Sequence, residues 1–154
     1  MHVATATATP GDTSPPVFTL PVRVYYEDTD AGGVVYYANY LRFCERARTE
    51  WLRTLGFSQA RMHQEEQILF VVRSVQADYY QGAILDDLLT VETTVSKLGG
   101  ASMCFEQRIL RQDQRLFSAR VTVACMGSES RRATPFPPAV RAQLATLVQT
   151  DERH

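Results

Sequence analysis

One amphipathic helical segment limits the folds open to this 154-residue chain. Between about Tyr37 and Leu55, apolar residues recur at three- and four-residue steps, the period of one buried helix face. These residues are Tyr40, Cys44, Ala47, Trp51 and Leu55. Gly56 predicts the C-terminal cap. The other long apolar segments carry strand patterns, so we expect the helix to bury this face against a sheet.

Five segments carry those strand patterns. Apolar and polar residues alternate most regularly in the last of them, which is typical of a strand with one buried face. The expected strands are 18–26, 68–77, 88–98, 102–110 and 116–126. Gly99 and Gly100 predict a hairpin turn, and residues 139–148 predict a short terminal helix. One helix against a mainly antiparallel sheet is an α+β architecture.

Composition indicates a single domain. A hydrophobic content of 45% over this length suits one core. Residues 1–16 have no hydrophobic period and predict a disordered N-terminal arm, which leaves 17–150 as the folded domain. No apolar stretch is long enough to span a membrane and no signal-peptide pattern is visible, so we expect a cytoplasmic protein. A net charge of −1 argues against nucleic-acid binding.

The junction before the helix, residues 27–36, combines acidic residues with a glycine pair. Asp28 and Asp30 could supply a carboxylate, and Gly32 and Gly33 allow the backbone to approach a ligand closely. The N-terminus of the helix adds free N–H donors and a positive dipole end, which suit an oxygen that gains negative charge. A purely structural role for either aspartate, as a cap or turn residue, is equally compatible with the pattern.

The sequence lacks the residues needed for several other common kinds of catalytic or binding site. His63 is the only histidine away from the termini, so a histidine metal site is not expected and a histidine-based triad would depend on this one residue. Neither a phosphate-binding loop nor a dinucleotide motif occurs. Carboxylate chemistry without metal or cofactor is what remains.

Residues 22–36, together with Asn39-Tyr40 and residues 45–48, resemble the signature of the hotdog-fold acyl-CoA thioesterases of the 4-hydroxybenzoyl-CoA thioesterase family. The chain is most similar to the bacterial branch associated with the Tol-Pal cell-envelope system, and the similarity runs from about residue 17 to 133. The resemblance implies a five-stranded antiparallel sheet wrapped around one long helix. It also implies a site formed between two subunits, in homodimers that often associate into homotetramers.

The same resemblance implies hydrolysis of an acyl-CoA to a free acid and CoA. It implies that Asp30 is the catalytic carboxylate, acting as nucleophile or as the base that activates water. The backbone N–H of Tyr37 aligns with the donor to the thioester carbonyl. The implied substrate-binding positions are Gly32, Gly33, Val34 and Glu45.

Two alternatives to this enzyme remain. A hotdog dehydratase acting on acyl carrier protein normally needs a histidine, for which only His63 is available. A non-catalytic module could instead bind acyl-CoA or acyl carrier protein and tether cell-envelope or phospholipid enzymes. Basic residues that could meet the CoA phosphates, or simply be solvated, are Arg73, Lys97, Arg131 and Arg132.

Overall fold

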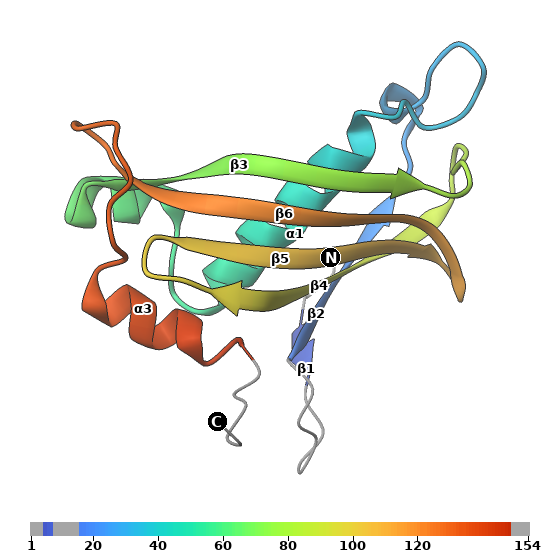
Figure 1. The fold of residues 1–154 in the computed structure, drawn as a ribbon. Helices are drawn as coiled ribbons and strands as arrows, with labels where there is room; N and C mark the ends of the chain where they lie inside the picture. The colour runs from blue at the N-terminus through green and yellow to red at the C-terminus, as the bar shows by residue number, and fades with distance from the viewer. Residues whose placement is uncertain (1–4, 8–15, 149–154) are drawn as a thin grey trace.

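A single antiparallel sheet lies against one long helix in the computed structural model, which describes residues 5–7 and 16–148 (Figure 1). The strands are β1 (Thr5–Thr7), β2 (Val17–Arg23), β3 (Ile68–Tyr79), β4 (Leu88–Leu98), β5 (Ser102–Arg111) and β6 (Gln114–Gly127). The helices are α1 (Asn39–Thr54), α2 (Gln59–Arg61) and α3 (Pro138–Ala145), with short turns η1 (Tyr26–Asp28) and η2 (Met62–Glu66). The expected α+β architecture of five long strands and one long helix is confirmed.

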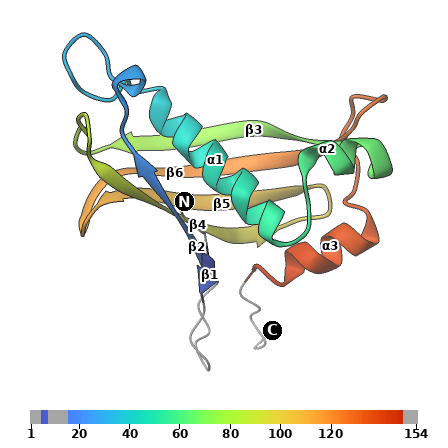
Figure 2. The same cartoon turned by 180° about the vertical axis from the view of Figure 1, so that it is seen from behind.

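The strand order is β1-β2-β4-β5-β6-β3, and each neighbouring pair is antiparallel. Helix α1 crosses one face of this sheet diagonally (Figure 2). Strand β3 pairs only with β6, so its other edge is open within the described part of the chain. The pairing of β3 shifts between Val72 and Ser74, which makes Arg73 the extra residue of a bulge.

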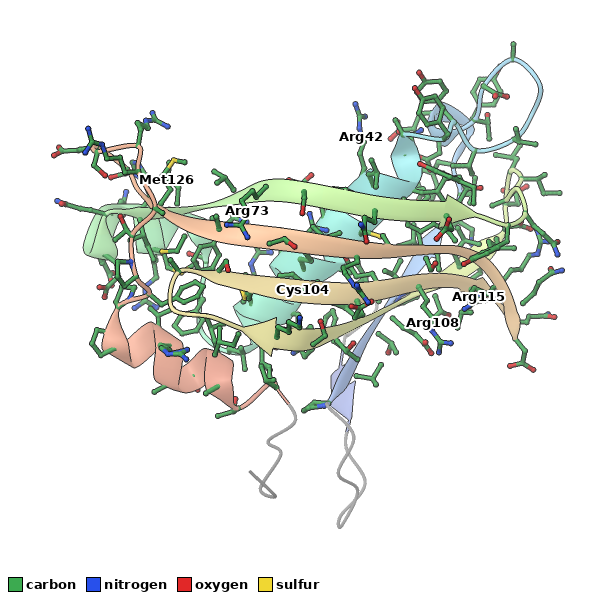
Figure 3. The ribbon with its side chains drawn as sticks, viewed as in Figure 1. Arg42, Arg73, Cys104, Arg108, Arg115 and Met126 are labelled. Carbon is green, nitrogen blue, oxygen red and sulfur yellow. The ribbon has the colours of Figure 1, made fainter. Side chains whose placement is uncertain are left out.

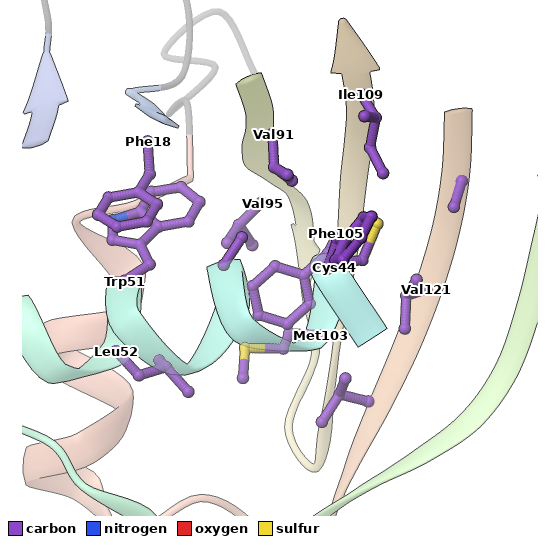
Figure 4. Close-up of a cluster of buried hydrophobic side chains, with 14 of the residues drawn as sticks. Phe18, Cys44, Trp51, Leu52, Val91, Val95, Met103, Phe105, Ile109 and Val121 are labelled. Carbon is purple, nitrogen blue, oxygen red and sulfur yellow. The ribbon is translucent and has the colours of Figure 1, made fainter. Parts of the chain in front are cut away.

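The core lies between α1 and the sheet (Figure 4). The ring of Trp51 stacks on that of Phe18, with centroids 5.7 Å apart. The expected inward residues of β6 are all buried, namely Phe117, Ala119, Val121, Val123 and Cys125. The helix stripe is also confirmed, except that Leu55 is only partly buried while Phe43 and Leu52 join the core.

Two boundaries differ from the prediction. The first strand ends at Arg23 rather than at Tyr26, because residues 26–28 form the turn η1. Helix α1 begins at Asn39 rather than at Tyr37, so Tyr37 lies in the turn that leads into the helix. Both differences fall in the junction whose acidic and glycine residues were singled out, where loop hydrogen bonds replace the regular pattern.

The expected disorder of residues 1–16 is wrong for Thr5–Thr7, which pair with residues 17–19 of β2. Threonine favours extended backbone, and the free edge of β2 offers unpaired N–H and C=O groups to it. The rest of that arm up to residue 15, and residues 149–150 of the expected domain, lie outside the described residues. Within the described part, no helix is long and apolar enough to cross a membrane.

Candidate active site

Residues 29–35, here called the Asp30 loop, connect η1 to the turn before α1. A bridge between Thr29 and Val35 closes the loop at its base. Val35 N–H donates to the carbonyl of Ala83 at 2.9 Å, and Val34 forms a bridge with Ile84. The loop is therefore anchored to the connection between β3 and β4, while its tip is exposed.

Asp28 has a structural role. Its side chain is buried, with 8% of the residue exposed, and Oδ2 accepts a hydrogen bond from Tyr25 N–H at 2.8 Å. Its main-chain oxygen accepts from Tyr36 N–H at 3.0 Å and from Asn39 Nδ2 at 2.9 Å. Asp28 thus ties the turn η1 to the start of α1, as expected for one of the two aspartates under the cap interpretation.

Asp30 is placed differently, on the exposed part of the loop. Its Oδ1 accepts from Gly32 N–H at 2.8 Å and from Val34 N–H at 3.4 Å. Within the described residues, Oδ2 has no hydrogen-bond partner. The loop amides fix the orientation of this carboxylate and leave one of its oxygens available to a ligand.

The glycine pair makes this arrangement possible. A Cβ atom at Gly32 would lie 3.3 Å from Oδ1 of Asp30, closer than most side-chain contacts. Gly33 has a φ of +84°, in the left-handed region that side chains other than glycine rarely adopt. Gly32 therefore gives the carboxylate room, and Gly33 allows the tight turn.

The turn around Tyr37 carries a free donor. The carbonyl of Tyr36 accepts from Asn39 N–H at 2.8 Å, and the carbonyl of Tyr37 accepts from the hydroxyl of Tyr79 at 2.9 Å. Among the described residues, Tyr37 N–H donates to no protein acceptor. The donor stands just ahead of α1, where the helix dipole is positive. Tyr37 as a whole residue is 62% exposed.

Glu45 lies farther along α1, on its exposed side. It lines a hollow of about 270 Å³ between the helix and β3, together with Leu41, Arg42, Arg48, Val72, Val75 and Val121. The structure thus brings Asp30, Gly32, Gly33 and Val34 into one loop close to Tyr37 in sequence. Glu45 stands apart from them, more than a helical turn beyond the start of α1.

Sequence reasoning missed a buried polar group that we call the Gln107 cluster: Gln107, Thr93, Arg48 and the main-chain oxygen of Cys44. Gln107 Oε1 accepts from Arg48 Nη1 at 2.8 Å. Its Nε2 donates to Cys44 O at 3.0 Å and to Thr93 Oγ1 at 2.9 Å. Burial lowers the pKa of the Arg48 guanidinium. The sequence signal that could have revealed this cluster is Gln107 itself, a polar residue at an inward-facing position of β5.

Among the described residues, neither a histidine nor a cysteine belongs to the Asp30 loop. His63 belongs to η2, at the opposite end of the sheet from this loop (Figure 1). Cys44, Cys104 and Cys125 are free. Burial raises the pKa of the Cys44 thiol to about 12, so it stays protonated and unreactive near neutral pH.

The basic candidates for CoA phosphates lie elsewhere. Arg73 and Lys97 border a hollow of about 640 Å³ on the face of the sheet opposite α1, together with Cys104 and Arg120. Figure 3 shows Arg73 and Cys104 on that face. Arg131 and Arg132 follow β6 in an exposed loop. The contact of any of these residues with a phosphate stays a prediction.

Known proteins match most of this chain. The family model described as the thioesterase-like superfamily matches residues 24–144. The acyl-CoA thioesterase YbgC of Haemophilus influenzae is 54% identical over 125 residues, which cover 81% of this chain and 92% of that protein. A probable thioesterase from Bartonella henselae has a crystal structure with a TM-score of 0.73 and 38% identity, covering 77% of this chain and 98% of that one.

A more distant crystal structure bears on the fold alone. It contains a variant of 4-hydroxybenzoyl-CoA thioesterase in complex with 4-hydroxybenzoyl-CoA, at a TM-score of 0.77 and 21% identity, and covers 82% of this chain and 97% of that one. The shared arrangement is the hotdog fold, a sheet wrapped around one long helix. The chain therefore belongs to the thioesterase-like superfamily of hotdog-fold proteins, and it is an acyl-CoA thioester hydrolase.

Proposed function

We propose that this thioesterase hydrolyses acyl-CoA with the carboxylate of Asp30 and the main-chain N–H of Tyr37. One observation carries the proposal: the loop holds Asp30 through Oδ1 alone, and the unengaged N–H of Tyr37 lies in the same junction. A carboxylate and a donor at a helix N-terminus are the two groups that attack on a thioester carbonyl requires.

In the proposed reaction, the thioester oxygen accepts a hydrogen bond from Tyr37 N–H. Negative charge develops on that oxygen as the carbonyl carbon becomes tetrahedral, and the N-terminus of α1 stabilises it. Asp30 either attacks the carbon, giving a mixed anhydride that water then cleaves, or takes a proton from an attacking water. Both routes consume one water and release the acid and the CoA thiol.

The other implied positions support this chemistry. The N–H groups of Gly32 and Val34 keep Asp30 oriented, and the turn at Gly33 keeps the loop close to the substrate. Glu45 would face the acyl group from the hollow along α1. Because a thiolate is a good leaving group, orientation, carbonyl polarisation and one carboxylate can be sufficient for turnover.

A homodimer formed through β3 completes the proposed site. Val72 and Val75 line the hollow beside α1 but remain 51% and 40% exposed, and the edge of β3 beside them is open. Apolar side chains next to unpaired strand groups favour the addition of a second strand. A second copy of this chain, which the family resemblance also implies, would cover them. Pairs of dimers would give the homotetramer.

Light scattering after size exclusion tests this interface. Val75→Glu places a charge in the hollow, whereas Gln76→Glu adds the same charge at the next residue, on the opposite face of β3. We expect Val75→Glu to lower the molecular mass to that of a monomer and to reduce activity, while Gln76→Glu changes neither. A dimer that tolerates both variants would exclude this face as the interface.

Resemblance to the Tol-Pal-associated branch supports a cytoplasmic setting near cell-envelope machinery, with acyl carrier protein as a second thioester carrier. Release of free thiol from a panel of short-chain, long-chain and aromatic acyl-CoAs would identify the acyl group that this enzyme prefers.

Asp30→Asn tests the mechanism on the best substrate of that panel. Asp113→Asn, in the exposed turn between β5 and β6, is the matched control. Since general acid–base groups contribute about 100- to 10,000-fold, we expect a loss of that size for Asp30→Asn and none for the control. A folded Asp30→Asn enzyme with undiminished turnover would contradict the mechanism.

A further inference from the structure

We propose that Tyr79 is a positioning residue that holds the Tyr37 turn, so that the N–H of Tyr37 faces the thioester carbonyl. The inference rests on the proposed function and adds a residue from a different part of the chain. Tyr79 is the last residue of β3, and its hydroxyl donates to the main-chain oxygen of Tyr37 at 2.9 Å.

The carbonyl of Tyr37 lacks the donor that a regular helix would supply. In an α-helix the N–H of residue 41 would reach this oxygen. Here Leu41 N–H donates to Ala38 O at 3.2 Å instead. The Tyr79 hydroxyl therefore takes the place of a helical N–H, and it fixes the peptide group that follows the proposed donor.

The peptide group that contains the proposed donor is fixed on its other side. Asn39 N–H donates to Tyr36 O at 2.8 Å, and Tyr36 N–H donates to Asp28 O at 3.0 Å. With Tyr79 added, three hydrogen bonds restrain the turn and leave Tyr37 N–H unengaged. A preorganised donor of this kind needs no reorganisation when charge develops on the substrate.

Tyr79 is itself held by aromatic packing. Its ring lies edge-on to Phe117 at 5.0 Å and to Tyr40 at 5.5 Å between centroids, and both of those rings are buried. The Tyr37 ring contacts it at 6.4 Å. Burial, and the neighbouring Tyr37 and Tyr40, raise the pKa of Tyr79, so the phenol keeps its proton and remains a donor across the neutral range.

The adjacent residue supplies a matched control. Tyr80 is as exposed as Tyr79, at 47% against 45%. Its hydroxyl is 3.0 Å from Ser118 Oγ, on the face of the sheet away from α1. Tyr79→Phe and Tyr80→Phe thus remove the same atom from neighbouring residues, and only the first removal touches the Tyr37 turn.

Kinetics and inhibitor binding together test the inference. Because a small misplacement of a reacting group costs up to about 100-fold, we expect Tyr79→Phe to lower kcat about 10- to 100-fold with little change in KM. Two analogues of the best substrate then probe the donor: a ketone, with CH2 in place of the thioester sulfur, and a thioether, with CH2 in place of the carbonyl. Tyr79→Phe should weaken binding of the ketone about tenfold and leave the thioether unaffected.

Three results would overturn the inference: equal kcat in the two tyrosine variants, equal weakening of both analogues, or a loss confined to thermal stability. An active Asp30→Asn enzyme would instead count against the proposed mechanism, and the ketone-to-thioether ratio would still decide the role of Tyr79. The two failures are therefore distinguishable.

Discussion

The Gln107 cluster and the Asp30 loop are both polar, yet they differ in how fully their hydrogen bonds are used. The Gln107 amide is bonded through both its oxygen and its nitrogen, in a residue that is fully buried. Asp30 and Tyr37 each keep one polar group that has no hydrogen-bond partner in the described part of the chain. A satisfied buried cluster holds α1 to the sheet, whereas unsatisfied exposed groups remain available to a ligand.

Gln107→Leu should give the largest change in stability. It removes the partner of the half-buried Arg48 guanidinium and of the buried Thr93 hydroxyl, and lost hydrogen bonds of this kind cost about 3 kcal/mol in total. Chemical denaturation would measure the loss in the free energy of unfolding, with the exposed Gln76→Leu as control. Turnover per folded molecule should be unchanged. An equal loss in both variants would contradict the structural role of the cluster.

Gly32→Ala, in the Asp30 loop, should have the opposite pattern to Gln107→Leu: it should lower activity and change stability little. The added Cβ would crowd Oδ1 of Asp30 at 3.3 Å, so the carboxylate must move. We expect kcat to fall about tenfold, with stability lowered by no more than about 1 kcal/mol. Steady-state kinetics and a thermal melt would separate the two effects. Full activity in Gly32→Ala would show that the position of Asp30 is not critical.

The Cys44 thiol predicts a pH effect on stability. Its pKa is about 12 in the folded protein and about 8.5 in an unfolded chain. Between these values the unfolded state loses the proton while the folded state keeps it, so stability falls as pH rises above about 8.5. From pH 8.5 to 9.5, wild type should lose about 1 kcal/mol more than Cys44→Ala. If the stability of wild type and of Cys44→Ala fell in parallel as the pH rises, the thiol would ionise equally in the folded and the unfolded state, which would contradict the prediction.

Thr93→Val should have only a small effect on stability. It removes one acceptor of Gln107 and keeps the shape of the side chain, so we expect a loss of about 1 kcal/mol and unchanged kcat. A double-mutant cycle with Gln107→Leu would measure the coupling between the two residues. Strict additivity would mean that the bond between them contributes little.

Much of the fold was predictable because it depends on regular periods. The alternation of apolar and polar residues in β6 predicted a strand and its buried face. The stripe of Tyr40, Cys44 and Trp51 predicted the long helix and the face that it buries. The assignment of Asp28 to a structural role depended on hydrogen bonds with Tyr25 and Asn39 that no period reveals.

The rest of the candidate site depends on contacts between distant parts of the chain. Tyr79 meets the turn at Tyr37 across 42 positions of sequence. The roles of Gln107 and Arg48 depend on the packing of α1 against β5. Propensity and spacing describe local structure, so contacts of this range become visible only once the strands and the helix are assembled.

The bulge at Arg73 has a consequence for insertions and deletions in β3. In a regular strand, Val72 and Val75 would face opposite sides because they are three positions apart. The extra residue brings both into the hollow beside α1 and leaves Tyr79 facing Phe117. Removing Arg73 would shorten the strand and keep these faces. Adding or removing a residue between Val75 and Tyr79 would instead turn Tyr79 away from Tyr37.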